Sequence, residues 1–217
     1  MPRILHIKAS PRAGSYSTAA ATRFLAKLTS ACPDLEVDCL DLWDAALPSM
    51  DVHTIEAKYA RLKGNSLSPD QAAAWKVIEE TVNCLDRSDR LVISTPLWNF
   101  GIPYKLKHFI DVITQPTLSF SFATDIGYRP LLKDRPTLVI LSSAGDYKDG
   151  PSWGRPDLAT PYLREALAFI GIRDVNFVAI GPTAGPNALV SEAVDRAAGE
   201  LATLGENWAS SSKALVA

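Results

Sequence analysis

The stretch RILHIKASPRAGSYST, residues 3–18, places a short apolar run directly before a loop rich in hydroxyls and small side chains. The apolar run, residues 3–9, has the length and the Ile and Leu content of a strand. After the loop, Phe24, Leu25 and Leu28 recur at helical spacing, and a Ser or Thr is available as N-cap. The stretch therefore predicts a strand, a loop and a helix in succession.

The same alternation continues along the chain. The most regular helix should begin at Pro69, because Ser68 can cap it and apolar residues then recur every three or four positions. Further strands are predicted at residues 35–42, 90–96, 137–145 and 175–181, and the alternating LSFSF at residues 118–122 suits a short hairpin strand. The central strands are too apolar for a sheet with one wet face. We therefore predict an α/β fold, a doubly wound five-stranded parallel sheet with helices on both faces.

Composition limits the class of protein. With 217 residues, of which 47% are hydrophobic, the chain can bury one substantial core, so residues 1–217 are expected to form a single domain. Residues 206–217 read as a small polar tail after a last helix from about residue 186 to 204. A formal net charge of −2 gives no reason to expect nucleic acid as a partner, because proteins that bind a phosphate backbone normally carry a basic stripe.

Three cysteines without paired spacing fit free thiols in a reducing compartment. No apolar run approaches the length of a membrane span, and the N-terminus lacks the pattern of a signal peptide. We therefore expect a soluble cytoplasmic protein that does not enter a membrane. His6, His53 and His108 have no ligand spacing, so no metal site is expected, and no G-x-S-x-G elbow supports a serine hydrolase.

In an open parallel sheet, ligands bind outside the carboxyl ends of the strands. The loops after the first, third and fourth strands of the predicted sheet should therefore meet at one edge. The first holds Ser10, Ser15, Tyr16 and Ser17 at the start of a helix, where free N–H groups and hydroxyls suit a phosphate monoester. The loop lacks the glycine patterns of dinucleotide and nucleoside triphosphate sites. An N-cap followed by an ordinary turn explains it equally well.

The second and third loops suit a flat ring. Residues 97–100, LWNF, put aromatic side chains beside backbone amides, which can hold a heteroaromatic ring by its face and its polar edge. Residues 142–145, SSAG, let a backbone approach closely and could stabilise negative charge on a ring during reduction. Each has a simpler alternative, since Trp98 and Phe100 could be core residues and SSAG could be a plain turn.

Four quoted segments together resemble one known family: SYS in the first loop, PLWNFGIP in the second, SSAGDYKDGP in the third, and TPYLREALAFIGIRDVNFV after it. The sequence is similar to the FMN-dependent NADH azoreductases, which belong with the flavodoxin-like NAD(P)H quinone oxidoreductases. The resemblance runs over nearly the whole chain. It implies a flavodoxin-like sheet of order 2-1-3-4-5, bound FMN, and NADH or NADPH as co-substrate.

The resemblance also implies site residues. The FMN phosphate would be held by Ser10, Ser15, Tyr16 and Ser17, and the ring would lie along Pro96, Leu97, Trp98, Asn99 and Phe100, with Ser142, Ser143, Ala144 and Gly145 at its pyrimidine end. In this family the active site lies at a homodimer interface. The resemblance therefore implies that Phe122 and Phe169 line the substrate pocket, and that they could do so from the opposite subunit. The chain departs from the family pattern at Ser143, Ala144, Tyr147, Trp98 and Phe122, which bears on substrate preference more than on FMN binding.

The implied chemistry is a ping-pong, two-electron hydride transfer in which a nicotinamide reduces FMN and a quinone or azo compound then takes its place. Tyr147, two residues after Gly145, is a hypothetical proton donor, and solvent is the alternative. A flavodoxin-type electron carrier without its own substrate is the competing interpretation. A phosphoesterase that uses the serine-rich loop is a third, and it predicts a colourless protein.

Overall fold

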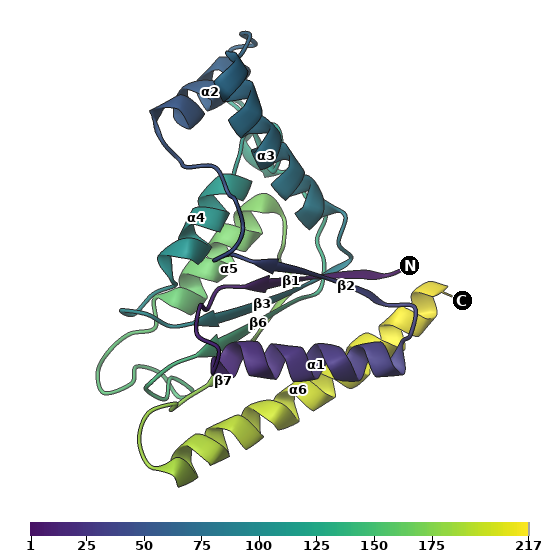
Figure 1. Ribbon diagram of the computed structural model, residues 1–217, viewed down its shortest axis with the longest axis vertical. Coiled ribbons are helices and arrows are strands. Elements are labelled where there is room, and N and C mark those ends of the chain that lie inside the picture. Colours follow the sequence, from purple (N-terminus) through teal and green to yellow (C-terminus); the bar gives the residue numbers. More distant parts are fainter. Residues whose placement is uncertain (217) are drawn as a thin grey trace.

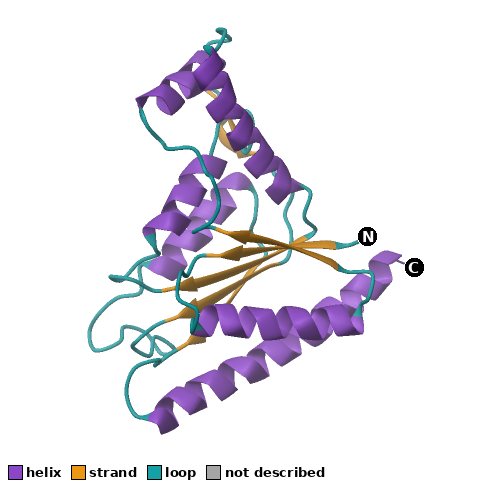
Figure 2. Cartoon of the chain, in the orientation of Figure 1, coloured by secondary structure: helices purple, strands orange, loops and turns teal. Residues whose placement is uncertain are grey.

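The computed structural model describes residues 1–216 of the 217-residue chain, and the side chains of residues 1–210. In chain order its elements are β1 (Arg3–Lys8), α1 (Tyr16–Ala31), β2 (Glu36–Asp41), α2 (Val52–Leu62), α3 (Pro69–Asp86), β3 (Arg90–Pro96), α4 (Tyr104–Ile113), β4 (Phe120–Ala123), β5 (Gly127–Pro130), β6 (Thr137–Ser142), α5 (Ala159–Ile170), β7 (Val175–Ile180) and α6 (Asn187–Val216). Helices lie on both sides of the central sheet (Figure 1, Figure 2).

Five parallel strands form this sheet in the order β2-β1-β3-β6-β7. Counted among the sheet strands alone, this is the order 2-1-3-4-5, so the predicted fold class is confirmed. The winding of the chain reverses between β1 and β3, which is where such sheets bind ligands. The loops after β1, β3 and β6 therefore leave three adjacent strands at one edge of the sheet.

The sequence of β1 explains why both faces are covered. Ile4 packs in a core cluster with residues of α1 and α6, whereas Leu5 and Ile7 belong to a second cluster with residues of α3, α4 and α5. Every residue of β6 is buried. A strand without a wet face requires helices on both sides of its sheet.

Two local predictions hold in detail. Ser68 caps α3 in a capping box, because its Oγ accepts from the N–H of Gln71 at 3.3 Å and the Gln71 Oε1 accepts from its N–H at 3.0 Å. Pro69 is the first residue of that helix. The short hairpin strand is also present, since β4 pairs antiparallel with β5.

The expectation of a polar tail at residues 206–217 is wrong for the part that the structure describes, because α6 continues to Val216. Trp208 is only 6% exposed and packs edge-to-face on Phe24, with 5.5 Å between ring centroids. The Trp208 carbonyl accepts a hydrogen bond from the Arg90 guanidinium at 2.8 Å. One indole therefore fixes an otherwise polar segment against α1, since an aromatic ring buries a large apolar area.

His6 is a buried titratable group within the sheet. It is 4% exposed, and its Nε2 lies 3.0 Å from the Ser94 Oγ on β3. Burial, helped by the charge of Lys8, lowers the pKa of His6 from 6.5 to about 4. Between pH 6.5 and about pH 4, His6 binds a proton in the unfolded chain but stays neutral in the folded chain. The stability contributed by neutral His6 is thus complete above pH 6.5 and is lost as the pH falls to 4.

We expect the wild type to lose about 3 kcal/mol more stability than His6→Gln between pH 7 and pH 4, because the lowered pKa of His6 makes folding compete with protonation. Urea unfolding of both proteins at the two pH values measures this difference. Equal losses in the two proteins would show that His6 does not control the acid sensitivity of the fold.

Candidate active site

The first loop ends in a cluster of buried hydroxyls at the start of α1. Ser15 is the N-cap, since its Oγ accepts from the N–H of Thr18 at 3.3 Å, and the Ser17 Oγ lies 3.1 Å from it. Ser10 is also buried, and its Oγ accepts from the N–H of Arg12 at 3.4 Å. The N–H groups of Tyr16 and Ser17 have no acceptor inside the helix. Ser15 alone satisfies the cap, so Ser10 and Ser17 add donors beyond those of an ordinary turn.

The second loop is a tight turn in a strained conformation. Trp98 and Gly101 exchange two N–H···O bonds of 2.9 Å, and the two residues between them have positive φ, 48° at Asn99 and 72° at Phe100. Such a conformation costs a residue with a side chain about 1–3 kcal/mol. Trp98 and Phe100 are 38% and 41% exposed, so the alternative that they are core residues is wrong. This turn places the side chains of Trp98 and Phe100 at the surface.

Neighbouring segments hold this turn in place. The N–H of Leu97 donates to the Ser142 carbonyl at 2.7 Å, which ties the second loop to the end of β6. The N–H of Leu158 donates to the Phe100 carbonyl at 2.9 Å, which ties it to the segment before α5. The turn therefore has a fixed position relative to the third loop.

The third loop is packed too closely for side chains at its glycine. A Cβ on Gly145 would lie 2.3 Å from the Ser152 Oγ, and a Cβ on Gly181 would lie 2.4 Å from the Gly145 carbonyl oxygen. Ser143 closes the loop, because its Oγ donates to that same carbonyl at 2.7 Å. At Gly145 the missing side chain leaves room for the Ser152 side chain, and at Gly181 it lets the backbone approach the Gly145 carbonyl.

A cavity of about 800 Å³ lies between the second and third loops, a size typical of sites for small molecules. Of the residues expected at a ligand, Leu97, Asn99, Phe100, Ser143, Ala144, Gly145 and Tyr147 line it. Pro96, Trp98, Ser142 and the first loop are not among its lining residues. The cavity wall also contains Trp153, Arg155 and parts of residues 182–189, which the sequence analysis did not place there.

Trp43 is a further residue at this edge of the sheet that was not predicted from the sequence. Its indole N–H donates to the Ala9 carbonyl at 3.2 Å, directly before the first loop. Its ring contacts Trp98 of the second loop and Tyr104 of α4, with centroid distances of 6.2 Å and 5.4 Å. Trp43 therefore joins the first loop to the second. Its position just after β2, at the carboxyl edge of the sheet, was the available signal.

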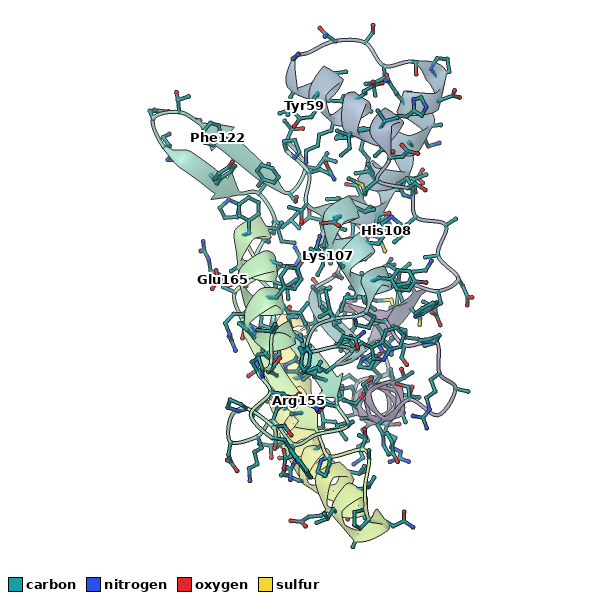
Figure 3. The ribbon with its side chains drawn as sticks, turned by 90° about the vertical axis from the view of Figure 1, so that its left-hand side faces the viewer. Tyr59, Lys107, His108, Phe122, Arg155 and Glu165 are labelled. Atoms are coloured by element: carbon teal, nitrogen blue, oxygen red, sulfur yellow. The ribbon has the colours of Figure 1, made fainter. Side chains whose placement is uncertain are left out.

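Phe122 and Phe169 lie elsewhere in the chain. They belong to a cluster of touching rings on the β4–β5 hairpin and α5, together with Phe120 and Tyr128. Figure 3 shows Phe122 near one end of the molecule, well away from Arg155. Neither Phe122 nor Phe169 lines the cavity, and they are 57% and 37% exposed. One chain by itself does not bring these rings to the loops.

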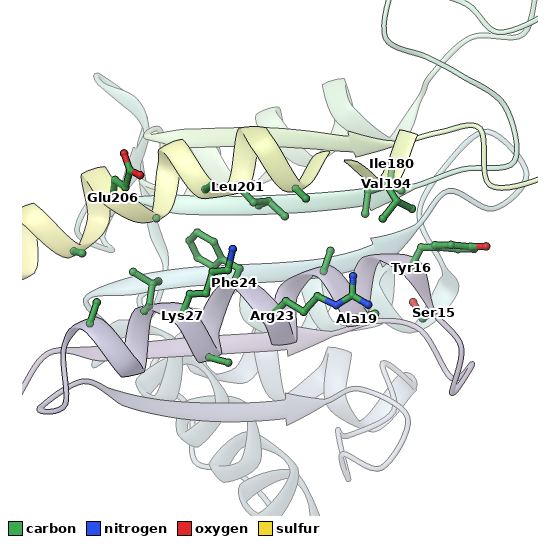
Figure 4. A pocket seen from close by; sticks show the side chains of 18 of the residues that line it. Ser15, Tyr16, Ala19, Arg23, Phe24, Lys27, Ile180, Val194, Leu201 and Glu206 are labelled. Atoms are coloured by element: carbon green, nitrogen blue, oxygen red, sulfur yellow. The ribbon is translucent and has the colours of Figure 1, made fainter. Parts of the chain in front are cut away.

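A separate groove of about 880 Å³ runs between α1 and α6 (Figure 4). Ser15 and Tyr16 lie at one end of it, and Arg23 and Lys27 reach from α1 toward the space between the helices. It shares only the edge of the first loop with the candidate site. Within the described chain, no group of three or more His, Cys, Asp and Glu side chains could hold a metal ion, and none of the described helices is long and apolar enough to span a membrane.

Curated relatives of similar length share the name FMN-dependent NADH:quinone oxidoreductase. A protein of Bradyrhizobium diazoefficiens named FMN-dependent NADH:quinone oxidoreductase 1 is 50% identical over 186 residues, which cover 86% of this chain and 89% of that protein. A protein of Nitratidesulfovibrio vulgaris named FMN-dependent NADH:quinone oxidoreductase is 39% identical over 203 residues, covering 91% of this chain and 97% of the relative.

Solved structures agree with the fold. The azoreductase from Bacillus anthracis strain Sterne is 26% identical and superposes with a TM-score of 0.86, covering 95% of this chain and all of that one. The FMN-dependent NADH-azoreductase from Bacillus anthracis strain Ames Ancestor, solved in complex with FMN, is 26% identical with a TM-score of 0.80 and covers 94% of this chain and all of that one. The family model described as flavodoxin-like fold matches residues 2–204. The chain therefore belongs to this flavodoxin-like family, Flavodoxin_2.

Proposed function

We propose that the protein is an FMN-dependent NADH:quinone oxidoreductase that also reduces azo compounds. The observation that carries the proposal is the meeting of three loops at the reversal point of the sheet, with anion donors in the first and a cavity for a flat ring between the other two. The names of relatives up to 50% identical support it.

The residues present fit FMN. Buried Ser10, Ser15 and Ser17, with the free N–H groups at the start of α1, would hold its phosphate. Pro96, Leu97, Trp98, Asn99 and Phe100 would lie along its ring, and residues 142–145 would meet the pyrimidine end. When bound, FMN supplies the capacity to take up two electrons from one partner and give them to another.

The chain contributes position and electrostatics. The backbone of Ala144 and Gly145 faces the cavity without bulky side chains and can donate hydrogen bonds to developing negative charge. The strained turn at Asn99 and Phe100 sets one wall of the cavity. Overall, NADH, a proton and a quinone give NAD⁺ and a hydroquinone, and cleavage of an azo bond to two amines needs the electrons of two NADH molecules.

Tyr147 lines the cavity, and its phenol can give a proton to the electron acceptor. We expect Tyr147→Phe to lower turnover with quinones about tenfold, because solvent can replace a proton donor only in part. Stopped-flow reoxidation of the NADH-reduced protein by a quinone measures the step. An unchanged rate would assign the proton to solvent.

The aromatic cluster of the β4–β5 hairpin supports a homodimer. Phe122, Tyr128 and Phe169 are exposed, and Tyr128 contacts both phenylalanine rings. Large exposed aromatic groups are typical of interfaces. In this proposal Phe122 and Phe169 close the cavity of the partner subunit. Light scattering of wild type and Phe122→Glu tests it, since a variant as dimeric as the wild type would remove the hairpin from the interface.

Steady-state oxidation of NADH in the presence of a quinone tests the proposed activity. An oxidoreductase turns over many equivalents of NADH, whereas a flavodoxin-type carrier needs a separate reductase and does not. The same assay with NADPH gives the preferred donor. A colourless protein that is inactive in this assay would favour the phosphoesterase alternative.

A further inference from the structure

Trp153 has a conformation and an exposure that folding does not explain. It is 95% exposed, so it buries almost no apolar surface. Its φ is 56°, in a region that residues with large side chains rarely adopt. Gly154, the next residue, has a φ of 75°, and the N–H of Arg155 donates to the Ser152 carbonyl at 3.0 Å. Two successive positive φ values inside this closed turn match a type I′ turn, for which Asn-Gly is the preferred sequence.

The turn is fixed against the candidate site. Ser152 at its base is buried, and its Oγ lies so close to Gly145 that a Cβ there would be 2.3 Å away. The segment that follows is held by the bond from the Leu158 N–H to the Phe100 carbonyl. Contacts with both loops therefore hold Trp153 and Arg155 at the cavity, which both residues line.

Arg155 supplies a free positive charge at this wall. Within residues 1–210, no hydrogen bond or ion pair holds its exposed guanidinium, whose side chain is labelled in Figure 3. The other charged group of the lining, Asp146, faces Arg196, with 3.6 Å between its Oδ1 and the guanidinium. That pair is neutral in sum, so the cavity wall offers one uncompensated positive charge. A single such charge matches a monoanion better than a pyrophosphate.

We propose that Trp153 and Arg155 form a subsite for electron acceptors that carry one carboxylate or sulfonate on a flat aromatic ring. The indole stacks on the ring, and the guanidinium binds the acidic group in two parallel hydrogen bonds. This inference rests on the proposed function and names the substrate class that the site prefers.

Titration calorimetry of the FMN-loaded protein with 1,4-naphthoquinone-2-sulfonate and with neutral 1,4-naphthoquinone tests the subsite. We expect Arg155→Gln to weaken binding of the sulfonate about tenfold and to leave the neutral quinone within a factor of about two. Arg87→Gln is the matched control, because it removes an exposed arginine at the end of α3. Equal weakening of both quinones by Arg155→Gln, or none, would overturn the proposal.

Trp153→Asn separates binding from folding. It gives the turn the Asn-Gly sequence, so the unfolding temperature should stay the same or rise, while both quinones bind about tenfold more weakly. A lowered unfolding temperature with unchanged binding would mean that Trp153 is structural. An altered KM for NADH with unchanged quinone binding would mean that Trp153 and Arg155 contact NADH instead of the quinone.

The proposed function and the subsite can be overturned separately. A wild-type protein that holds FMN but reduces neither quinone overturns the proposed function and the subsite together. A wild type that reduces both quinones, with variants that bind them as the wild type does, overturns the subsite alone.

Discussion

Ser15→Asp is expected to fold normally and to bind FMN about a thousandfold more weakly than the wild type. Aspartate caps a helix as well as serine does, so the bond to the N–H of Thr18 can be kept and α1 retains its start. The new carboxylate lies where the phosphate would be held. Two like charges about 4 Å apart near a protein surface repel by about 4 kcal/mol, which corresponds to nearly three powers of ten in affinity.

Ser68→Asp is the matched control for this change. Ser68 caps α3 with the same bond to a backbone N–H, but it belongs to none of the three loops. FMN titrations of the two apoproteins, followed by flavin fluorescence, should give a large loss for Ser15→Asp and none for Ser68→Asp. Equal FMN affinities in the two variants would place the phosphate away from the start of α1.

Arg135→Met is expected to lower the free energy of unfolding by about 4 kcal/mol. The Arg135 side chain is 3% exposed, and its guanidinium donates to the carbonyls of Leu85, Ser88 and Lys133 and pairs with the Asp86 carboxylate at 3.0 Å. It thereby holds the end of α3 against the segment before β6. Methionine fills similar space but leaves these buried acceptors without donors, which costs several kcal/mol.

Urea unfolding of Arg135→Met and of Arg87→Met measures this contribution. Arg87 lies at the same end of α3 and is exposed, so its replacement should change stability by less than about 0.5 kcal/mol. A loss below about 1 kcal/mol in Arg135→Met would mean that water replaces the guanidinium at those carbonyls.

The sheet could be predicted because its strands are unambiguous. Residues 90–95 of β3 and all of β6 are buried, and strands buried on both faces require helices on both sides of the sheet. The loops could be placed because parallel strands put their carboxyl ends at one edge. The N-cap at Ser68 could be predicted because a cap depends only on residues within one helical turn; the reciprocal bond from Gln71 was not predicted.

The remaining features depend on contacts between distant segments. The sequence around Trp208 is polar, and the burial of its ring depends on a contact with Phe24, which lies far away in sequence. The position of Trp43 after β2 indicates only the edge of the sheet, and its contacts with Ala9 and Trp98 join segments far apart in sequence. Trp153 follows no local pattern, because its turn is fixed by contacts with the other loops. The strain at Phe100 was also hidden, since a Trp-Asn-Phe-Gly turn is held by the carbonyls and amides of two other segments.

We expect this chain to hold FMN at the three loops and to pass electrons from NADH to an acceptor. The most direct test is the visible spectrum of the purified protein, recorded without oxygen before and after addition of NADH. We expect a yellow protein whose flavin band bleaches with NADH and returns when a quinone is added. A protein that remains colourless after incubation with FMN, or a flavin band that NADH does not bleach, would contradict it.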